Sequence, residues 1–251
     1  MGGERVRAVF FDLDDTLVLT HSATSAAYHA LQAFLSTRLH SPAAADAVDG
    51  DALVRHFDRS LETQPWDPSN QIDVTEWRAG LWSKALQAQG IQDIELAREL
   101  QTCFDKERLL AFQWAAGVEV IVKNLLAQGV KVGLITNGHM KVQRAKLRAC
   151  KADELFEIIL VGGEEANEKP HKDIFVKACD LAGCKPEEAI MIGDNLKTDI
   201  QGGLNAGFQG TIWVNIHNLE KVPIESGQPH YIISKIGDLP EVLKSFGLEN
   251  C

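Results

Sequence analysis

The chain has 251 residues, of which 45% are hydrophobic and 24% are charged. This composition is typical of a folded globular protein and excludes an intrinsically disordered one. The formal net charge is -10 at pH 7, which disfavours binding to nucleic acid through bulk positive charge. An anionic substrate must therefore be attracted by local groups.

The five cysteines are odd in number and include no Cys-x-x-Cys pair. We therefore expect reduced thiols in a reducing compartment and no zinc site. The apolar run before Asp12 is too short for a signal peptide or a membrane span. These features predict a cytoplasmic protein that has neither a nucleic acid nor a membrane as its partner.

Short apolar runs that alternate with helix-like segments predict an α/β fold with a parallel sheet. The runs show no polar alternation, which is typical of strands buried on both faces. In chain order the runs are Val6–Phe11, Val130–Ile135, Glu157–Val161, Ala189–Ile192 and Thr211–Val214. The helix-like segments are Val118–Gln128, Met140–Cys150, Lys172–Ala182 and Leu196–Ala206. Right-handed crossovers then place helices on both faces of the sheet.

The stretch from Thr20 to Phe112 contains no convincing strand and predicts an inserted helical domain. Breaks divide it into about four helices. They lie at Ser41-Pro42, Pro65 to Pro68 and Gln89-Gly90. We expect a catalytic core made of residues 1–19 and 113–251, with a helical cap at 20–112. After Pro223, residues His230–Ile233 and a helix near Leu239–Phe246 add an edge strand and a covering helix.

The insert carries three tryptophans and, near its start, His21 and His29. We expect Trp66, Trp77 and Trp82 to form the core of the insert rather than platforms for stacking a base. The two histidines are close enough to the insertion point to touch a substrate, but a single histidine is more often structural or solvated. No residue of the insert is therefore assigned a role in substrate choice.

Acidic residues follow two of the predicted strands. Asp12, Asp14 and Asp15 come after the first run, Asp194 follows the fourth, and Asp199 lies one helical turn later. The carboxyl ends of parallel strands are where ligands bind in open α/β sheets, although each motif alone is equally typical of a helix cap. If the two strands are neighbours, the carboxylates of Asp12 and Asp194 lie about 5 Å apart, which requires a cation or a proton. Oxygen ligands without nearby His or Cys favour Mg²⁺.

Two further motifs offer groups that suit a phosphate. Thr136-Asn137-Gly138 supplies a hydroxyl, an amide and backbone N–H donors, and Lys169 places a cation just before a helix. Taken singly, an Asn-Gly turn and a solvated lysine explain these residues equally well. Because all four motifs occupy the same place in successive strand–helix units, we expect them to form one site.

The charges of this predicted site nearly balance. Four aspartates (Asp12, Asp14, Asp194 and Asp199) oppose Mg²⁺ and the Lys169 ammonium, which leaves one excess negative charge before a phosphate dianion enters. Protonation of Asp14 removes that excess. The count therefore predicts a protonated acid at Asp14.

The sequence resembles the haloacid dehalogenase superfamily through DLDDT at Asp12–Thr16, ITNG at Ile135–Gly138, EKP at Glu168–Pro170 and GDNLKTD at Gly193–Asp199. The resemblance implies a Rossmann-like, doubly wound core with a helical cap inserted after the first motif. It also implies that Asp12 is the nucleophile and that Asp14 is the general acid and base.

The remaining roles follow from the same resemblance. Thr136 and Lys169 bind the phosphate, together with backbone N–H groups around Leu13 and Asn137. Mg²⁺ is held by the Asp12 carboxylate, the Asp14 backbone carbonyl and Asp194. Asp199 orients water or Lys169 from behind these ligands.

The expected activity is Mg²⁺-dependent hydrolysis of a small-molecule phosphate ester, such as a sugar phosphate, through a phosphorylated Asp12. Asp14 argues against dehalogenation, because a halide leaves without a proton. A nucleotidase, another sugar-phosphate phosphatase, a phosphomutase and a non-catalytic binding module with the same fold remain as alternatives. The sequence predicts neither the oligomeric state nor the residues that select the substrate.

Overall fold

The computed structural model describes residues 5–38, 48–64, 66 and 71–249. The chain forms two compact units, one made of Met1–Thr20 with Phe112–Cys251 and the other of His21–Ala111. We describe each unit by itself. In the described residues, no helix is both long enough and apolar enough to cross a membrane.

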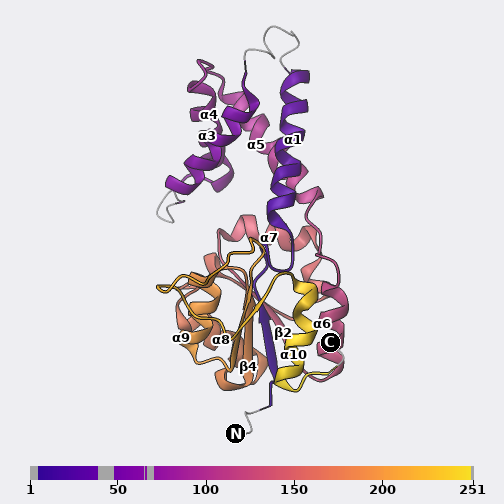
Figure 1. Ribbon diagram of the computed structural model, residues 1–251. Coiled ribbons are helices and arrows are strands. Elements are labelled where there is room, and N and C mark those ends of the chain that lie inside the picture. Colours follow the sequence, from indigo (N-terminus) through magenta and orange to yellow (C-terminus); the bar gives the residue numbers. More distant parts are fainter. Residues whose placement is uncertain (1–4, 39–47, 65, 67–70, 250–251) are drawn as a thin grey trace. The chain divides into compact units, whose positions relative to one another are not determined.

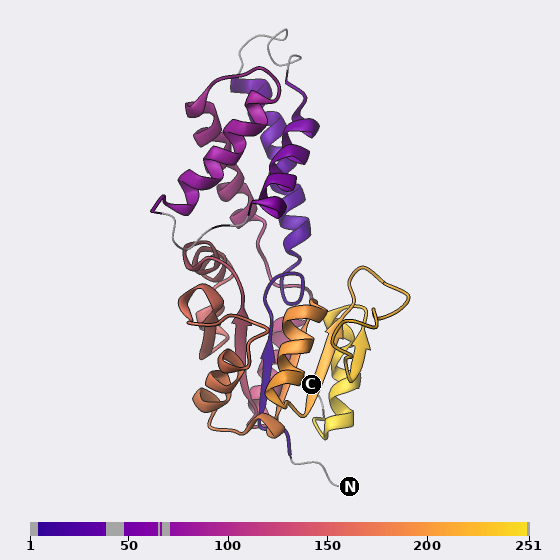
Figure 2. The same ribbon diagram turned by 90° about the vertical axis from the view of Figure 1, so that its left-hand side faces the viewer.

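The first unit is built on one sheet of six parallel strands, in the order β3-β2-β1-β4-β5-β6. Figure 2 shows the indigo strand β1 inside the sheet rather than at its edge. The strands are β1 (Ala8–Phe11), β2 (Lys131–Thr136), β3 (Ile158–Val161), β4 (Ala189–Gly193), β5 (Gly210–Val214) and β6 (Tyr231–Ile233). The parallel order confirms the predicted α/β, doubly wound class.

Helices cover both faces of this sheet, with α8 and α9 on one face and α6 and α10 on the other (Figure 1). The helices are α6 (Val118–Ala127), α7 (Met140–Ala149), α8 (Lys172–Ala182), α9 (Gln201–Ala206) and α10 (Leu239–Leu243). Every residue of β1 is buried. Phe10 packs with Phe175 of α8 and with Phe208 in one apolar cluster. The apolar runs are therefore strands because both of their faces are removed from water.

Short turns of 3₁₀ helix complete the connections of the first unit. They are η1 (Ala152–Glu154), η2 (Gly162–Glu164), η3 (Pro186–Glu188), η5 (Ile236–Asp238) and η6 (Lys244–Phe246). One prediction needs correction here: the segment Leu196–Ala206 is not a single α-helix. It begins as a π turn, η4 (Leu196–Ile200), and only then continues as α9. Such turns are rare and occur frequently at functional sites.

The second unit consists of helices in its described residues. These are α1 (Thr20–Arg38), α3 (Gly50–Thr63), α4 (Val74–Gln87) and α5 (Ile94–Leu110). The predicted break at Gln89-Gly90 separates α4 from α5. Ser41-Pro42 lies outside the described residues, as does the Pro65 to Pro68 segment except for Trp66.

Aromatic side chains form the core of the helical unit. Trp82 is fully buried and stacks on Phe57, with ring centroids 3.8 Å apart, and Phe104 packs against both. The indole N–H of Trp82 donates to the side-chain oxygen of Gln101. Trp82 is therefore a core residue, as predicted, and Trp77 packs against the edge of the same cluster.

Candidate active site

Asp12 and Asp194 lie at the carboxyl ends of neighbouring strands. β1 pairs with β4 so that Phe11 lies opposite Ile192. The backbone N–H of Asp12 then donates to the carbonyl of Ile192 over 2.9 Å. Asp12, Asp194 and Asp199 each present a carboxylate oxygen within 4.8 Å of the others. The predicted convergence of the two acidic motifs is therefore confirmed.

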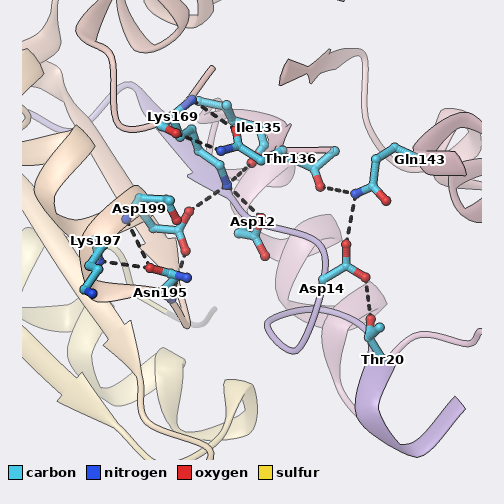
Figure 3. Close-up of polar contacts among 12 residues, drawn as sticks. Asp12, Asp14, Thr20, Ile135, Thr136, Gln143, Lys169, Asn195, Lys197 and Asp199 are labelled. Atoms are coloured by element: carbon cyan, nitrogen blue, oxygen red, sulfur yellow. Dashed lines mark hydrogen bonds and ion pairs between the residues drawn. The ribbon is translucent and has the colours of Figure 1, made fainter. Parts of the chain in front are cut away.

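Lys169 reaches this cluster from another connection and is almost completely buried. Its ammonium donates to Asp12 Oδ1 over 2.7 Å, to Asp199 Oδ1 over 2.6 Å and to the Ile135 carbonyl over 2.6 Å (Figure 3). Burial lowers the pKa of Lys169, but the two carboxylates outweigh it and raise the pKa above its ordinary value. The site therefore contains a buried, charged lysine with three acceptors, as its burial requires.

Asp199 is fully buried in the π turn η4 and is held from two sides. Its Oδ1 accepts from Lys169, and its Oδ2 accepts from the backbone N–H of Asn195 over 3.0 Å. A Cβ at Gly193 would lie only 2.3 Å from Asp199 Oδ2, so the close approach of this carboxylate requires glycine at the end of β4. The sequence predicts that Asp199 orients either water or Lys169. Its contact with the Lys169 ammonium matches the second of these roles.

The side-chain amide of Asn137 has a different role from the phosphate binding that the sequence predicts. Its side-chain amide donates to the Lys169 carbonyl over 2.7 Å, and its side-chain oxygen accepts from the Lys169 N–H over 3.0 Å. The amide therefore fixes the backbone of Lys169 across 32 residues of sequence. Only the backbone N–H of Asn137 remains as a candidate for phosphate binding. At Leu13, too, only the backbone N–H is a candidate, because the side chain is apolar and fully buried.

Thr136 ends β2 next to the acidic cluster and is buried. Its hydroxyl oxygen accepts a hydrogen bond of 2.6 Å from Gln143 Nε2, on α7. A hydroxyl that accepts through its oxygen keeps its own hydrogen to donate elsewhere. Thr136 is thus equipped to donate to an anion.

Asp14 is not the protonated acid that the charge count predicts. Its carboxylate accepts from Thr20 over 2.6 Å, from Gln143 over 2.9 Å and from Lys146 over 2.7 and 2.8 Å. Burial raises the pKa of Asp14, but Lys146 and the hydrogen bonds outweigh it and lower the pKa to about 2. The prediction was wrong because the count omitted Lys146, whose charge belongs to the site.

Gln143 and Lys146 are the site residues that the sequence analysis missed, together with Thr20, which was assigned to the insert. Gln143 and Lys146 lie on the buried face of α7 beside Leu147. One sequence signal could have found these two residues. They are polar, yet their spacing places them on the apolar face of an amphipathic helix. That signal is weak, because the same pair fits a solvated helix margin.

The acidic cluster has the donor chemistry of a hard divalent cation. Burial and then the neighbouring acids Asp12 and Asp199 raise the pKa of Asp194 to about 8. Burial also raises the pKa of Asp12 in spite of Lys169. Carboxylates in this state bind either a proton or a cation, and a set of oxygen ligands suits Mg²⁺. Asp12 and Asp194 are the better donors, because both oxygens of Asp199 already have partners.

Residues 6–207 match the family of haloacid dehalogenase-like hydrolases. The chain belongs to this family. It is 36% identical over 248 residues to human N-acylneuraminate-9-phosphatase, a match that spans 98% of this chain and 96% of the relative. It is 26% identical to the glyceraldehyde 3-phosphate phosphatase of Pyrococcus furiosus, over 96% of this chain and 94% of that one. This haloacid dehalogenase-like hydrolase is therefore a phosphatase.

A solved structure shows the same fold. The HAD-hydrolase YfnB from Bacillus subtilis, bound to magnesium, superposes with a TM-score of 0.67 at 24% identity and covers 96% of this chain and 99% of that one. Together with the six-stranded sheet, this likeness confirms the Rossmann-like fold of the hydrolase. The segments from Val161 to Phe175 and from Gly193 to Asn215 also look like N-acylneuraminate-9-phosphatase, and the match over nearly the whole chain confirms that likeness.

Proposed function

We propose that the protein is a Mg²⁺-dependent phosphatase that hydrolyses a phosphate monoester through a phosphorylated Asp12. The observation that carries the proposal is the pairing of Asp12 with Asp194 across two strand ends, with Lys169 on Asp12 Oδ1. The carboxylates of Asp12 and Asp194 and the backbone carbonyl of Asp14 would hold the ion. When bound, Mg²⁺ supplies positive charge that lets a carboxylate approach an anionic ester.

The residues of the chain then divide the reaction into two steps. A carboxylate oxygen of Asp12 forms a bond to phosphorus while the bond from phosphorus to the alcohol oxygen breaks. Asp14, which must first leave the Lys146 ammonium and take up a proton from water, gives that proton to the alcohol oxygen. Water next attacks the phosphorus of the aspartyl-phosphate, gives a proton to Asp14 and releases inorganic phosphate and the Asp12 carboxylate. The Thr136 hydroxyl and the backbone N–H groups of Leu13 and Asn137 bind the phosphoryl oxygens. The Lys169 ammonium, whose three hydrogens are already donated, stabilises the negative charge of these oxygens by its own charge.

The aspartate at position 12 is tested by Asp12→Asn, which keeps the shape of the side chain and removes the nucleophile. We expect phosphate release to fall by a factor of about 10³ or more. Asp15→Asn is the matched control three residues away. Asp15 adopts a left-handed conformation with φ 54°, which asparagine tolerates, and the mutant is expected to keep most of its turnover. Wild-type turnover in Asp12→Asn would remove Asp12 from the reaction.

For the substrate we propose N-acylneuraminate 9-phosphate. Support comes from the 36% identity to a phosphatase named for that ester, which extends over the helical unit as well as the sheet unit. We infer that the helical unit, His21–Ala111, acts as the cap that selects the ester. A nucleotidase or another sugar-phosphate phosphatase of the same family is the alternative, because the residues of the site recognise only the phosphoryl group and its ester oxygen.

A panel of phosphate esters decides between these substrates. It contains N-acylneuraminate 9-phosphate, glyceraldehyde 3-phosphate, several hexose phosphates, nucleoside monophosphates and pyrophosphate, each assayed for kcat/KM with Mg²⁺. We expect the sialic acid ester to have the highest kcat/KM by about tenfold or more, since a difference of that size needs only about 1.4 kcal/mol of extra binding in the transition state. A higher value for a nucleoside monophosphate would refute this substrate.

We also propose that the enzyme acts in the cytoplasm. The four cysteines among the described residues are free thiols, which suits a reducing compartment. Its partner in this proposal is the small-molecule ester alone. The net charge of -10 argues against nucleic acid as a further partner.

A further inference from the structure

Helix α7 contributes two buried polar residues to the site, and both contact Asp14. Gln143 and Lys146 lie one helical turn apart and are 2% and 6% exposed. The Lys146 ammonium also lies 5.8 Å from the ring centroid of Phe112. A lysine that is buried to this extent requires a strong reason to leave water. Its two short contacts with Asp14 supply that reason.

The carboxylate of Asp14 has all of its acceptor positions occupied. Oδ1 accepts from Thr20 and Lys146, and Oδ2 accepts from Gln143 and Lys146. Figure 3 shows this carboxyl group turned towards Gln143 and Thr20. A carboxylate has about four lone-pair positions. In this arrangement neither oxygen can share a proton with a leaving group, so Asp14 must give up a partner in order to act.

Gln143 links Asp14 to the Thr136 hydroxyl, which the proposed function assigns to phosphate binding. Its amide nitrogen donates one hydrogen to Asp14 and the other to Thr136 Oγ1. Both of its hydrogens are then used, and the hydroxyl of Thr136 is fixed as an acceptor on that side. Thr136 is therefore left with its own hydrogen as a donor.

We propose that Gln143 and Lys146 are positioning residues for phosphoryl transfer. Lys146 holds the Asp14 carboxyl in one defined place, from which it moves to the leaving oxygen, and Gln143 sets the direction of the Thr136 hydroxyl. This inference rests on the proposed function, in which Asp14 protonates the alcohol and Thr136 binds the phosphoryl group. Neither residue touches the substrate in this scheme.

The role proposed for Lys146 predicts a kinetic effect that depends on the leaving group of the ester. Protonation by Asp14 matters for an alkyl ester, whose alkoxide is a poor leaving group, and matters little for p-nitrophenyl phosphate, whose phenolate leaves without a proton. The ratio kcat/KM reports only the steps up to the first irreversible one, here the transfer to Asp12. It therefore excludes the hydrolysis step that both substrates share.

Lys146→Met removes the ammonium and keeps a side chain of similar length beside Phe112. We expect kcat/KM for the best alkyl ester of the panel to fall about tenfold or more, because misplacement of a catalytic group has effects of this order. For p-nitrophenyl phosphate we expect a change of less than about threefold. Arg148→Met, an exposed position on the same helix, is the matched control and should change neither value. Equal losses for both esters, or no loss, would overturn the role of Lys146.

Gln143→Leu keeps the bulk of the side chain and removes the amide. We expect the inhibition constant of inorganic phosphate, a probe for the Thr136 hydroxyl, to rise about tenfold, which corresponds to the loss of one good hydrogen bond to an anion. Lys146→Met should leave this constant within about twofold. An unchanged constant in Gln143→Leu would overturn the role of Gln143.

The variant Asp12→Asn separates this inference from the proposed function. If Asp12→Asn keeps its turnover, the proposed function fails whatever the variants of α7 do. If Asp12→Asn is inactive and the kinetics of Lys146→Met do not depend on the leaving group, only the inference about α7 fails. Circular dichroism and thermal unfolding of every variant show whether a loss of activity comes from a loss of fold.

Discussion

The two units of the molecule are built around opposite kinds of centre. In the sheet unit, the buried Lys169 ammonium contacts the buried carboxyl groups of Asp12 and Asp199. In the helical unit the centre is an aromatic stack of Phe57 on Trp82. A buried charge is stable only with its partners, whereas an apolar stack is stable by itself. The first centre is therefore suited to chemistry, and the second serves to hold helices together.

The largest effect is expected from breaking the charged centre. Lys169→Met leaves the carboxylates of Asp12 and Asp199 without their shared cation. We expect activity to be lost and the free energy of unfolding to fall by about 3 to 5 kcal/mol, as when one partner of a buried ion pair is removed. Lys177→Met is the control, since Lys177 pairs with Glu165 while half exposed, and should cost less than about 1 kcal/mol. Denaturant unfolding measures the free energy of unfolding of both variants. Equal losses in Lys169→Met and Lys177→Met would refute the special role of the buried charged centre.

Breaking the aromatic centre is expected to affect stability without affecting the chemistry. Trp82→Ala removes a fully buried ring and the hydrogen bond to Gln101. The expected loss is about 3 to 5 kcal/mol in the free energy of unfolding. At a temperature where the variant is folded, its kcat/KM for p-nitrophenyl phosphate should change less than about threefold. Leu110→Ala, 65% exposed, is the control with little expected effect. A large loss of chemistry in folded Trp82→Ala would show that the two centres are coupled.

A smaller effect, on thermal stability, is expected from pH and Mg²⁺. The folded-state pKa of Asp194, about 8, lies above its ordinary value of 3.8. The folded protein therefore holds more protons than the unfolded one between these values, and without a divalent cation this group makes the protein less stable as pH rises from about 4 to 8. Mg²⁺ competes with that proton, so we expect its addition to raise Tm more at pH 8 than at pH 6.

Calorimetry with EDTA or Mg²⁺ at pH 6, 7 and 8 measures this difference. Asp194→Asn removes the titrating carboxyl and is the control, in which Mg²⁺ should change Tm little at any pH. A Mg²⁺ effect of the same size at every pH would show that the Asp194 carboxyl does not bind the ion. Such a result would not contradict the ion pairs of Lys169 with Asp12 and Asp199, because the cation in those pairs is the Lys169 ammonium and not Mg²⁺.

Most of the sheet unit could be predicted because its signals are local. The apolar runs give strands, and an acidic motif directly after a strand lies at the sheet edge wherever that strand is placed. For this reason the two motifs alone predicted that Asp12 and Asp194 lie at the same edge of the sheet, whereas the pairing of β1 with β4 came from the tertiary structure. The error at Asp14 has a different origin, because the charge on Asp14 depends on Lys146, which is 132 residues away.

The sequence by itself determined the class of fold, the helical insert and the set of acidic and phosphate-binding candidates, since strand periodicity and strand-end chemistry are properties of contiguous residues. Only the tertiary structure decided which candidates have partners. In the structure, Lys169 lies between Asp12 and Asp199, and Asp14 pairs with Lys146. The Asn137 amide binds the backbone of Lys169. The physical reason is that the charge on a buried group is set by neighbours in space, and those neighbours come from distant parts of the chain.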